Sequence, residues 1–304
     1  MTVAVIDIGT NTVLLLVVRV TAGGGMAPML YEQRIPRLGQ GVDTRRNLAP
    51  DAMERAIGVL EEYKTLMAPT KPDVTVVCGT SALRDAVNRE EFAARVRERT
   101  GFQIEVLSGE EEALWTYRGA LSGLTGIARA TVVDIGGGST EVTVGDGPAI
   151  LHRISLDIGS VRISERFFRH DPPTHPELEA AIELIEDALA RAGDFPFAGS
   201  TLVGVAGTAT TLAALAQGLK RFDVAAVTNY RLSSDVVENL FHLLRDMSSA
   251  RIRELSDVME GRSDVITAGA LILREIMAHF KFSEMIVSER GVRYGLAMRE
   301  IQRR

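Results

Sequence analysis

Two short glycine-rich stretches, one near the start of the chain and one near its middle, contain residues that could bind a phosphate group. The first runs from residue 7 to 12 and the second from residue 134 to 141, and each begins with Asp-Ile-Gly. An apolar run precedes each stretch and a run rich in β-branched residues follows it, which is typical of a β-hairpin. The turn of such a hairpin presents backbone N–H groups and hydroxyls to an anion. Two such turns predict two half-molecules that grip phosphate from opposite sides of a cleft.

The second turn combines a glycine triplet with two carboxylates. Gly136, Gly137 and Gly138 permit positive φ angles and a close approach of the backbone to phosphate. Glycine triplets are common in hairpin turns, but Asp134 and Glu141 flank this one. Beside a bound phosphate, carboxylates are useful when they hold a hard cation such as Mg²⁺ or position water. Asp134 is the stronger candidate for the metal ligand.

Each predicted hairpin is followed by a second matched feature, a buried strand that runs directly into a helix. The interval from Asp7 to Gly79 is nearly equal to the interval from Asp134 to Gly207. Both glycines end an apolar run and precede a threonine and small residues. A helix that begins there directs its free N–H groups and its dipole beyond the sheet edge. The matched spacing predicts a duplicated α/β half-molecule.

Two charged residues near these junctions have both a structural and a catalytic interpretation. Glu112 ends a run of three glutamates at the start of a predicted helix, where the helix dipole stabilises acidic residues by about 0.3–1 kcal/mol each. Glu111 completes a capping box with Ser108, whereas Glu112 could face the cleft as a general base. Arg84 could bind two phosphate oxygens through its guanidinium or form a surface ion pair. The residue pattern leaves these alternatives open.

The elements that would position these residues can be predicted from periodicity and capping signals. Ser122–Gly126 is the candidate linker between the two halves. Strands are expected at 104–107 and 285–288, in addition to those at the turns. The expected helices are 51–63 capped by Asp51, 88–100 closed by Gly101, 108 to about 121, 174–193 with Thr174 and Glu177 as a capping box, 263–280, and a last helix that begins at Gly291.

The composition limits the class of protein. A chain of 304 residues can form two domains of roughly 150 residues each. The net charge of −6 argues against nucleic-acid binding through bulk positive charge. The single cysteine, Cys78, excludes an internal disulfide and is expected in a buried strand, and the five histidines lack metal-ligand spacing. No signal peptide or apolar run long enough to span a membrane is visible, so we expect a cytoplasmic protein.

The paired Asp-Ile-Gly turns resemble those of the acetate kinase, sugar kinase, Hsp70 and actin superfamily, and the complete set of motifs resembles the exopolyphosphatase and guanosine pentaphosphate phosphohydrolase (Ppx/GppA) family. The motifs occur in the family's order over almost the whole chain. They are residues 7–12 (DIGTNT), 37–41 (RLGQG), 79–84 (GTSALR), 108–113 (SGEEEA), 134–141 (DIGGGSTE), 207–211 (GTATT), 262–266 (RSDVI) and 288–293 (SERGVR).

This resemblance implies an α/β fold of two duplicated ribonuclease H-like domains that face each other across a cleft. The expected domains are residues 1–124 and 125–291, with the C-terminal helix 292–304 packing back on the first. The family pattern commonly reads Arg-Glu-Gly at residues 293–295, and Tyr294 stands in place of the glutamate. The sequence ends at Arg304, without the further helical domains of the long-form enzymes, so we do not expect a preference for very long chains.

The resemblance also implies roles for individual residues. Glu112 would be the catalytic base, Arg84 would hold phosphate, and Glu141 would position water and, with Asp134, the metal. Mg²⁺ is the expected cofactor, with stimulation by a monovalent cation as a further option. The remaining expected substrate-binding residues are Asp7, Gly9, Thr10, Asn11, Thr12, Ser81, Gly136, Gly137, Gly138, Ser139, Thr140, Gly207 and Thr208.

The implied activity is release of terminal orthophosphate from inorganic polyphosphate, guanosine pentaphosphate or both, by in-line attack of water. A small-molecule kinase of the same superfamily and a non-catalytic sensor of guanosine tetraphosphate or pentaphosphate are the alternatives. Ala206-Gly207, where such kinases often have two glycines, argues mildly against the kinase. Neither a nucleic acid nor a membrane is an expected partner, and the resemblance suggests a homodimer.

Overall fold

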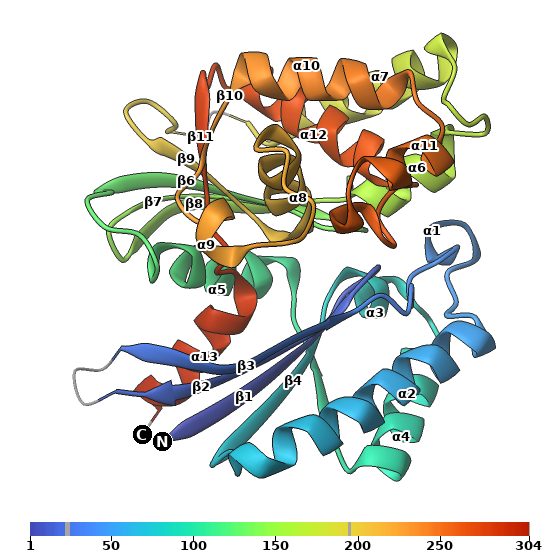
Figure 1. Ribbon diagram of the computed structural model, residues 1–304. Coiled ribbons are helices and arrows are strands. Elements are labelled where there is room, and N and C mark those ends of the chain that lie inside the picture. The colour runs from blue at the N-terminus through green and yellow to red at the C-terminus, as the bar shows by residue number, and fades with distance from the viewer. Residues whose placement is uncertain (22–24, 194–195, 304) are drawn as a thin grey trace.

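The computed structural model describes residues 1–21, 25–193 and 196–303, and contains two β-sheets stacked with helices between and around them (Figure 1). The first sheet has the strand order β3-β2-β1-β4-β5 and the second has the order β10-β11-β9-β6-β7-β8. The strands are β1 (Thr2–Ile8), β2 (Val13–Val20), β3 (Met26–Arg34), β4 (Val74–Gly79), β5 (Ile104–Val106), β6 (Arg129–Ile135), β7 (Thr140–Asp146), β8 (Ala149–Leu156), β9 (Thr201–Val205), β10 (Arg231–Ser233) and β11 (Glu284–Val287).

Helices connect the strands and cover the sheets. The longest, α2, packs beside the first sheet, and α7, α10 and α12 lie together on the outer side of the second (Figure 1). The α-helices are α1 (Val42–Arg45), α2 (Pro50–Met67), α3 (Ser81–Asp85), α4 (Arg89–Thr100), α5 (Gly109–Leu121), α6 (Ser160–Phe167), α7 (His175–Arg191), α8 (Ala206–Ala216), α9 (Val224–Val227), α10 (Ser234–Arg245), α11 (Ser249–Leu255), α12 (Ile266–His279) and α13 (Val292–Gln302). Two short 3₁₀ helices are η1 (Ala68–Thr70) and η2 (Asp257–Met259).

The two sheets repeat one topology, which confirms the predicted fold class. In the first, β1, β2 and β3 form an antiparallel meander, and β4 and β5 add parallel strands on the other side of β1. In the second, β6, β7 and β8 form the meander, and β9 and β11 add the parallel strands. The second sheet differs only by β10, an antiparallel edge strand.

Strand β1 contributes to a separate core on each face of the first sheet. Ile6 and Ile8 pack in a cluster with residues of α2 and α4, whereas Val3 and Val5 pack in a cluster with residues of α13. This alternation follows from the two-residue repeat of side chains along a strand. A strand that is buried on both faces reads as a continuous apolar run, as this one does.

Helices α5 and α13 fill the space between the two sheets. Tyr117 and Ala120 of α5 belong to a cluster with residues of β6 and β9 in the second sheet, whereas α13 contacts β1 and β2 of the first. The two helices meet at glycines: a Cβ atom on Gly119 would lie 2.9 Å from the backbone nitrogen of Gly295, and one on Gly295 would overlap the carbonyl of Trp115. Chain segments far apart in sequence therefore meet at one helix crossing. The division into domains at residues 124 and 125 stays a prediction.

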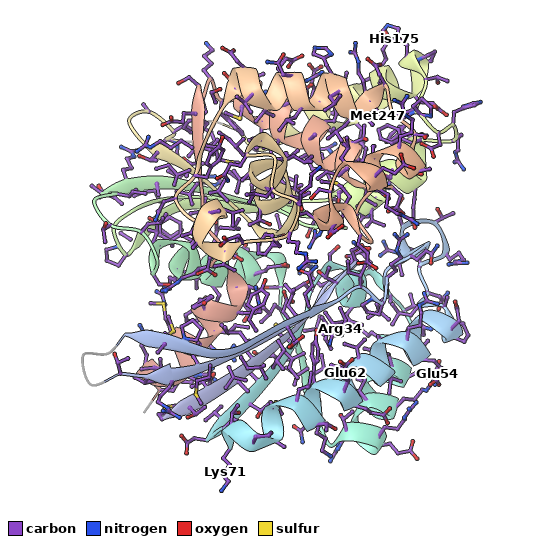
Figure 2. The ribbon with its side chains drawn as sticks, viewed as in Figure 1. Arg34, Glu54, Glu62, Lys71, His175 and Met247 are labelled. Carbon is purple, nitrogen blue, oxygen red and sulfur yellow. The ribbon has the colours of Figure 1, made fainter. Side chains whose placement is uncertain are left out.

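Ion pairs tie α2 to its neighbours at the surface. Nη2 of Arg34, on β3, lies 2.6 Å from Oε1 of Glu62, and the two side chains lie together in Figure 2. Glu54, also on α2, bonds to Arg99 of α4 at 2.7 Å. Such exposed pairs contribute about 0.2–1 kcal/mol each, so the buried clusters account for most of the attachment of α2.

Most of the predicted elements are present. Strand β10 and helices α6, α10 and α11 were not predicted from the sequence, and there are three further differences. Asp51 is not the cap of α2: Ala49 occupies that position, Pro50 begins the helix, and Asp51 pairs instead with Arg55. Helix α12 begins at Ile266 rather than at residue 263. Strands β3 and β8 were not predicted, because their partly exposed residues do not alternate regularly between apolar and polar. No helix in the described parts of the chain is long and apolar enough to cross a membrane.

Candidate active site

The two Asp-Ile-Gly turns face each other, as the sequence predicts. Each turn is closed by a backbone bond, from Gly9 N–H to the Thr12 carbonyl at 2.9 Å and from Gly136 N–H to the Ser139 carbonyl at 3.0 Å. A Cβ atom on Gly137 would lie 2.9 Å from Cβ of Thr10. The turns are therefore in contact across the junction between the two sheets.

The reason for the glycine triplet differs from the one expected. Gly136, Gly137 and Gly138 all have φ angles outside the left-handed region, so positive φ does not explain them. The close approach of neighbouring residues explains the glycine at position 138. A side chain on Gly138 would collide with Ser81, and its Cβ would lie 2.9 Å from Oγ1 of Thr10. Glycine here allows the second turn to pack against the first turn and against the start of α3.

A cleft of about 1080 Å³ opens beside the two turns. Most of the predicted site residues line it, whereas Arg84, Thr140 and Glu141 are not among its lining residues. Thr140 is fully buried, and its hydroxyl donates to the carbonyl of Ile158 at 2.5 Å, so it is not available to a phosphate. The predicted residues that line the cleft are Asp7, Gly9, Thr10, Asn11, Thr12, Ser81, Glu112, Asp134, Gly136, Gly137, Gly138, Ser139, Gly207 and Thr208.

The start of α8 forms another wall of the cleft. No side chain caps this helix, whose backbone N–H groups and dipole favour an anion. Ala206 has a φ of 61°, a left-handed conformation that is unusual for a residue with a side chain. Gly207 leaves room for the guanidinium of Arg262, which a side chain at that position would overlap. The hydroxyl of Thr208 donates to the Ile135 carbonyl at 3.2 Å.

Glu112, which lines the cleft, forms an ion pair with Arg84, which does not. Nη1 of Arg84 lies 2.5 Å from Oε2 of Glu112. Nη2 of Arg84 donates to the hydroxyl of Ser139 at 3.2 Å and lies 3.7 Å from Oε1 of Glu141. Arg84 therefore links a residue of α5 to the second turn. Glu112 is 7% exposed and faces the cleft, whereas Glu111 completes the predicted capping box and Glu110 pairs with Arg153 at the surface.

The two residues proposed as metal ligands are cross-strand neighbours. Asp134 and Glu141 are directly opposite each other on β6 and β7. The Oδ2 atom of Asp134 accepts a bond from the hydroxyl of Thr116 at 3.4 Å, and Asp134 lines the cleft. Glu141 is 2% exposed and accepts a bond from the Ser155 hydroxyl at 2.7 Å. Glu141 thus lies behind the cleft wall, and Asp134 is the more accessible of the two.

The buried carboxylates raise one another's pKa values. Burial, followed by the charge of Glu112, raises the pKa of Asp7 to about 7 and that of Asp134 to about 8. Burial also raises the pKa values of Glu112 and Glu141, and the charge of Arg84 opposes both shifts. Four carboxylates, those of Asp7, Glu112, Asp134 and Glu141, thus act on one another in this part of the site, and the guanidiniums of Arg84 and Arg293 oppose the pKa shifts.

The donor set fits a hard divalent cation. In the described ranges, no group of three or more histidine, cysteine, aspartate or glutamate residues is arranged to hold a metal. Mg²⁺ does not need such a cage, because it commonly binds through one or two carboxylates together with substrate phosphates and water. Asp7 and Asp134, whose carboxylates line the cleft, match that requirement.

Several residues that shape the site were not selected from the sequence as site residues. Arg262 and Arg293 line the cleft; Arg293 is buried, and Arg262 is partly buried. Arg262 donates to Oε1 of Gln33 at 3.2 Å. Both arginines lie in motifs that the sequence analysis quoted, and an arginine within two residues of a glycine in such a motif is the signal that could have identified them.

A set of ion pairs on one side of the cleft joins segments of the two halves. Arg37 bonds both carboxylate oxygens of Asp264, at 2.6 and 2.9 Å, and the backbone N–H of Gly41 donates to the carboxylate of Glu165. Arg162 bonds to Asp43 and, at 2.5 Å, to Asp85. These contacts hold the facing turns together. Periodicity does not reveal them, because the partners lie far apart in the sequence.

Comparison with known proteins identifies relatives along the whole chain. The sequence profile of the Ppx/GppA phosphatase family matches residues 16–304. Exopolyphosphatase 2 of Mycobacterium tuberculosis is 37% identical over 312 aligned residues, which cover 97% of this chain and 97% of that protein. A guanosine-5'-triphosphate,3'-diphosphate pyrophosphatase of Vibrio atlanticus is 30% identical, over 97% of this chain and 58% of that protein. The crystal structure of an Aquifex aeolicus member of the Ppx/GppA protein family is 34% identical with a TM-score of 0.84, over 100% of this chain and 98% of that chain.

Proposed function

This chain belongs to the Ppx/GppA phosphatase family, and we propose that it releases terminal orthophosphate from inorganic polyphosphate, from guanosine pentaphosphate, or from both. The relatives named above are an exopolyphosphatase and a guanosine pentaphosphate pyrophosphatase, which are hydrolases of phosphoanhydride bonds. The observation that carries the proposal is the position of Glu112, whose carboxylate faces the cleft beside the two apposed glycine-rich turns.

In the proposed reaction, the terminal phosphoryl group lies between the two turns. Backbone N–H groups of the turns and the hydroxyls of Thr10 and Ser139 donate to its oxygens, as does the guanidinium of Arg84. Such preorganised donors stabilise the charge that develops in the transition state. Glu112 orients a water molecule and accepts its proton as the water oxygen attacks phosphorus in line. The bridging P–O bond breaks, and orthophosphate and the shortened polyphosphate, or guanosine tetraphosphate, leave.

The proposal includes Mg²⁺ held by Asp134 and Asp7 at the mouths of the turns, with Glu141 behind Asp134 supporting the local charge. When bound there, Mg²⁺ would neutralise charge on the phosphate oxygens and on these carboxylates. The fit of the donor set described above supports this assignment, and omission of the metal tests it directly.

The test is a parallel measurement of phosphate release from short polyphosphate, long polyphosphate and guanosine pentaphosphate, each with Mg²⁺ and with EDTA. We expect Mg²⁺-dependent release from at least one of the three, and a ratio of kcat/KM values that identifies the principal substrate. Binding without release from any of them would contradict the proposal and would favour a sensor. Release from ATP only in the presence of an acceptor molecule would instead favour a kinase.

A further inference from the structure

Arg293 is a buried cation with an unused hydrogen-bond donor at the wall of the cleft. It lies in the first turn of α13, is 5% exposed and is one of the residues that line the cleft. Its Nη2 atom donates to the hydroxyl of Tyr31 at 3.3 Å, whereas its Nη1 atom is buried and has no hydrogen-bond partner. A buried guanidinium nitrogen without a partner is costly, so its presence points to a ligand.

The position of Arg293 is set by close packing on two sides. Its guanidinium carbon lies 4.5 Å from the centre of the Tyr31 ring, an arrangement that fixes the plane of the group. The start of α13 is held against α5 through Gly119, whose missing side chain leaves room for the Gly291 carbonyl. The same helix α5 carries Glu112. The crossing of α5 and α13 therefore joins the helix that carries Arg293 directly to the helix that carries the proposed base.

No carboxylate of the site neutralises Arg293 by direct contact. In the described ranges, Arg293 takes part in no ion pair, although its charge lowers the pKa values of Asp7 and Asp134 against the effect of burial. Arg84, by contrast, already bonds to Glu112. The guanidinium of Arg293 thus has no anionic partner among the described residues, although it lines the same cleft as Asp7 and Asp134.

We propose that Arg293 is a substrate-binding residue and that its unpartnered Nη1–H group donates to an anionic oxygen of the phosphate chain. This assignment rests on the proposed function and adds a second phosphate-binding guanidinium to Arg84. Arginine suits this role because it stays charged when buried and donates in a fixed plane. The alternative is a purely structural role, in which Arg293 stabilises the fold through Tyr31 alone.

The test measures binding without turnover. Isothermal titration calorimetry with tripolyphosphate, in buffer that contains Mg²⁺, compares the Glu112→Gln variant with the Glu112→Gln/Arg293→Met double variant. Because a hydrogen bond to a charged group contributes about 1.5–3 kcal/mol, we expect Arg293→Met to weaken binding about 10- to 100-fold. Arg299→Met in the same background is the matched control, because Arg299 is on the same helix, is 9% exposed and bonds to Glu105 and Glu300. It should leave the affinity within about twofold.

If Arg293→Met fails to fold, the same binding measurement on Arg293→Lys tests the role of Arg293. Lysine keeps the positive charge and most of the buried stem, so we expect intermediate affinity and, with Glu112 intact, a larger change in KM than in kcat. Unchanged affinity in the Met variant, or in the Lys variant when only that one folds, would overturn the role of Arg293 and leave the proposed function standing. Failure of the Glu112→Gln parent to bind any polyphosphate or guanosine pentaphosphate would overturn both.

Discussion

Nη1 of Arg84 lies 2.5 Å from Oε2 of Glu112, so the proposed phosphate-binding guanidinium is paired with the proposed base. Arg84 also reaches Ser139 on the opposing turn. In the proposed reaction, a phosphoryl group bound between the turns would compete with Glu112 for Arg84. In this arrangement, substrate binding would free the carboxylate for the water molecule, because the guanidinium has a new anionic partner.

Replacing Glu112 with glutamine should remove most of the turnover and keep substrate binding. A positioned general base contributes about 10²- to 10⁴-fold to rate, so kcat should fall by about that factor in steady-state phosphate release. Glu110→Gln and Glu111→Gln are matched controls from the same helical turn, since one residue is exposed and the other caps the helix. Equal losses in all three variants would exclude a specific role for Glu112.

Replacing Arg84 with alanine should raise KM and move the acid limb of the pH profile of kcat/KM to higher pH. Burial raises the pKa of Glu112 and the charge of Arg84 lowers it, so loss of the guanidinium removes the stabilisation of the carboxylate. Arg84→Lys should shift the acid limb less than Arg84→Ala does, because lysine keeps the positive charge. An alanine variant with unchanged KM and an unshifted limb would place Arg84 outside the site.

Replacing Gly295 with alanine should destabilise the protein and reduce activity together. A Cβ atom there would overlap the Trp115 carbonyl, which forces α13 away from the helix that carries Glu112. Overpacking of this kind costs about 1–3 kcal/mol, measurable by urea unfolding. Gly58→Ala is the matched control, since Gly58 lies within α2 with open space around it. Gly58→Ala should stabilise the protein by about 0.5–1 kcal/mol. A similar increase in stability for Gly295→Ala would show that α5 and α13 are not in close contact at Gly295.

The metal-free protein should lose stability as pH rises from about 4 to about 8. Asp7 and Asp134 have pKa values of about 7 and 8 when folded, against an ordinary value of 3.8. Folding thus favours their protonated forms, and this contribution, complete below about pH 4, is lost as pH rises through 7 and 8. Thermal unfolding in EDTA measures the effect. Asp134→Asn should flatten the decline, whereas exposed Asp51→Asn should not. A decline that is equally steep in Asp134→Asn would show that this carboxyl is not its source.

Local patterns in the sequence determined the chemical parts of the site. The hairpin turns at Asp7 and Asp134, the strand-to-helix junctions at Gly79 and Gly207, and the capping box at Ser108 all depend on hydrogen bonds and side-chain spacing within a few residues. Short-range signals of this kind can be read from the chain alone. The repetition of the pattern then predicted the duplicated sheets.

Tertiary packing decided which groups face the cleft and which charges remain unpaired. Thr140 and Glu141 follow the turn in sequence, yet their side chains form hydrogen bonds with Ile158 and Ser155. Arg293 enters the site only because α13 crosses α5 at paired glycines. Hydrogen-bond partners and burial depend on contacts between segments that are distant in the chain, and such contacts leave no periodic signal in the sequence. For this reason the residue types of the site were predictable, but their exposure, pairing and charge balance were not.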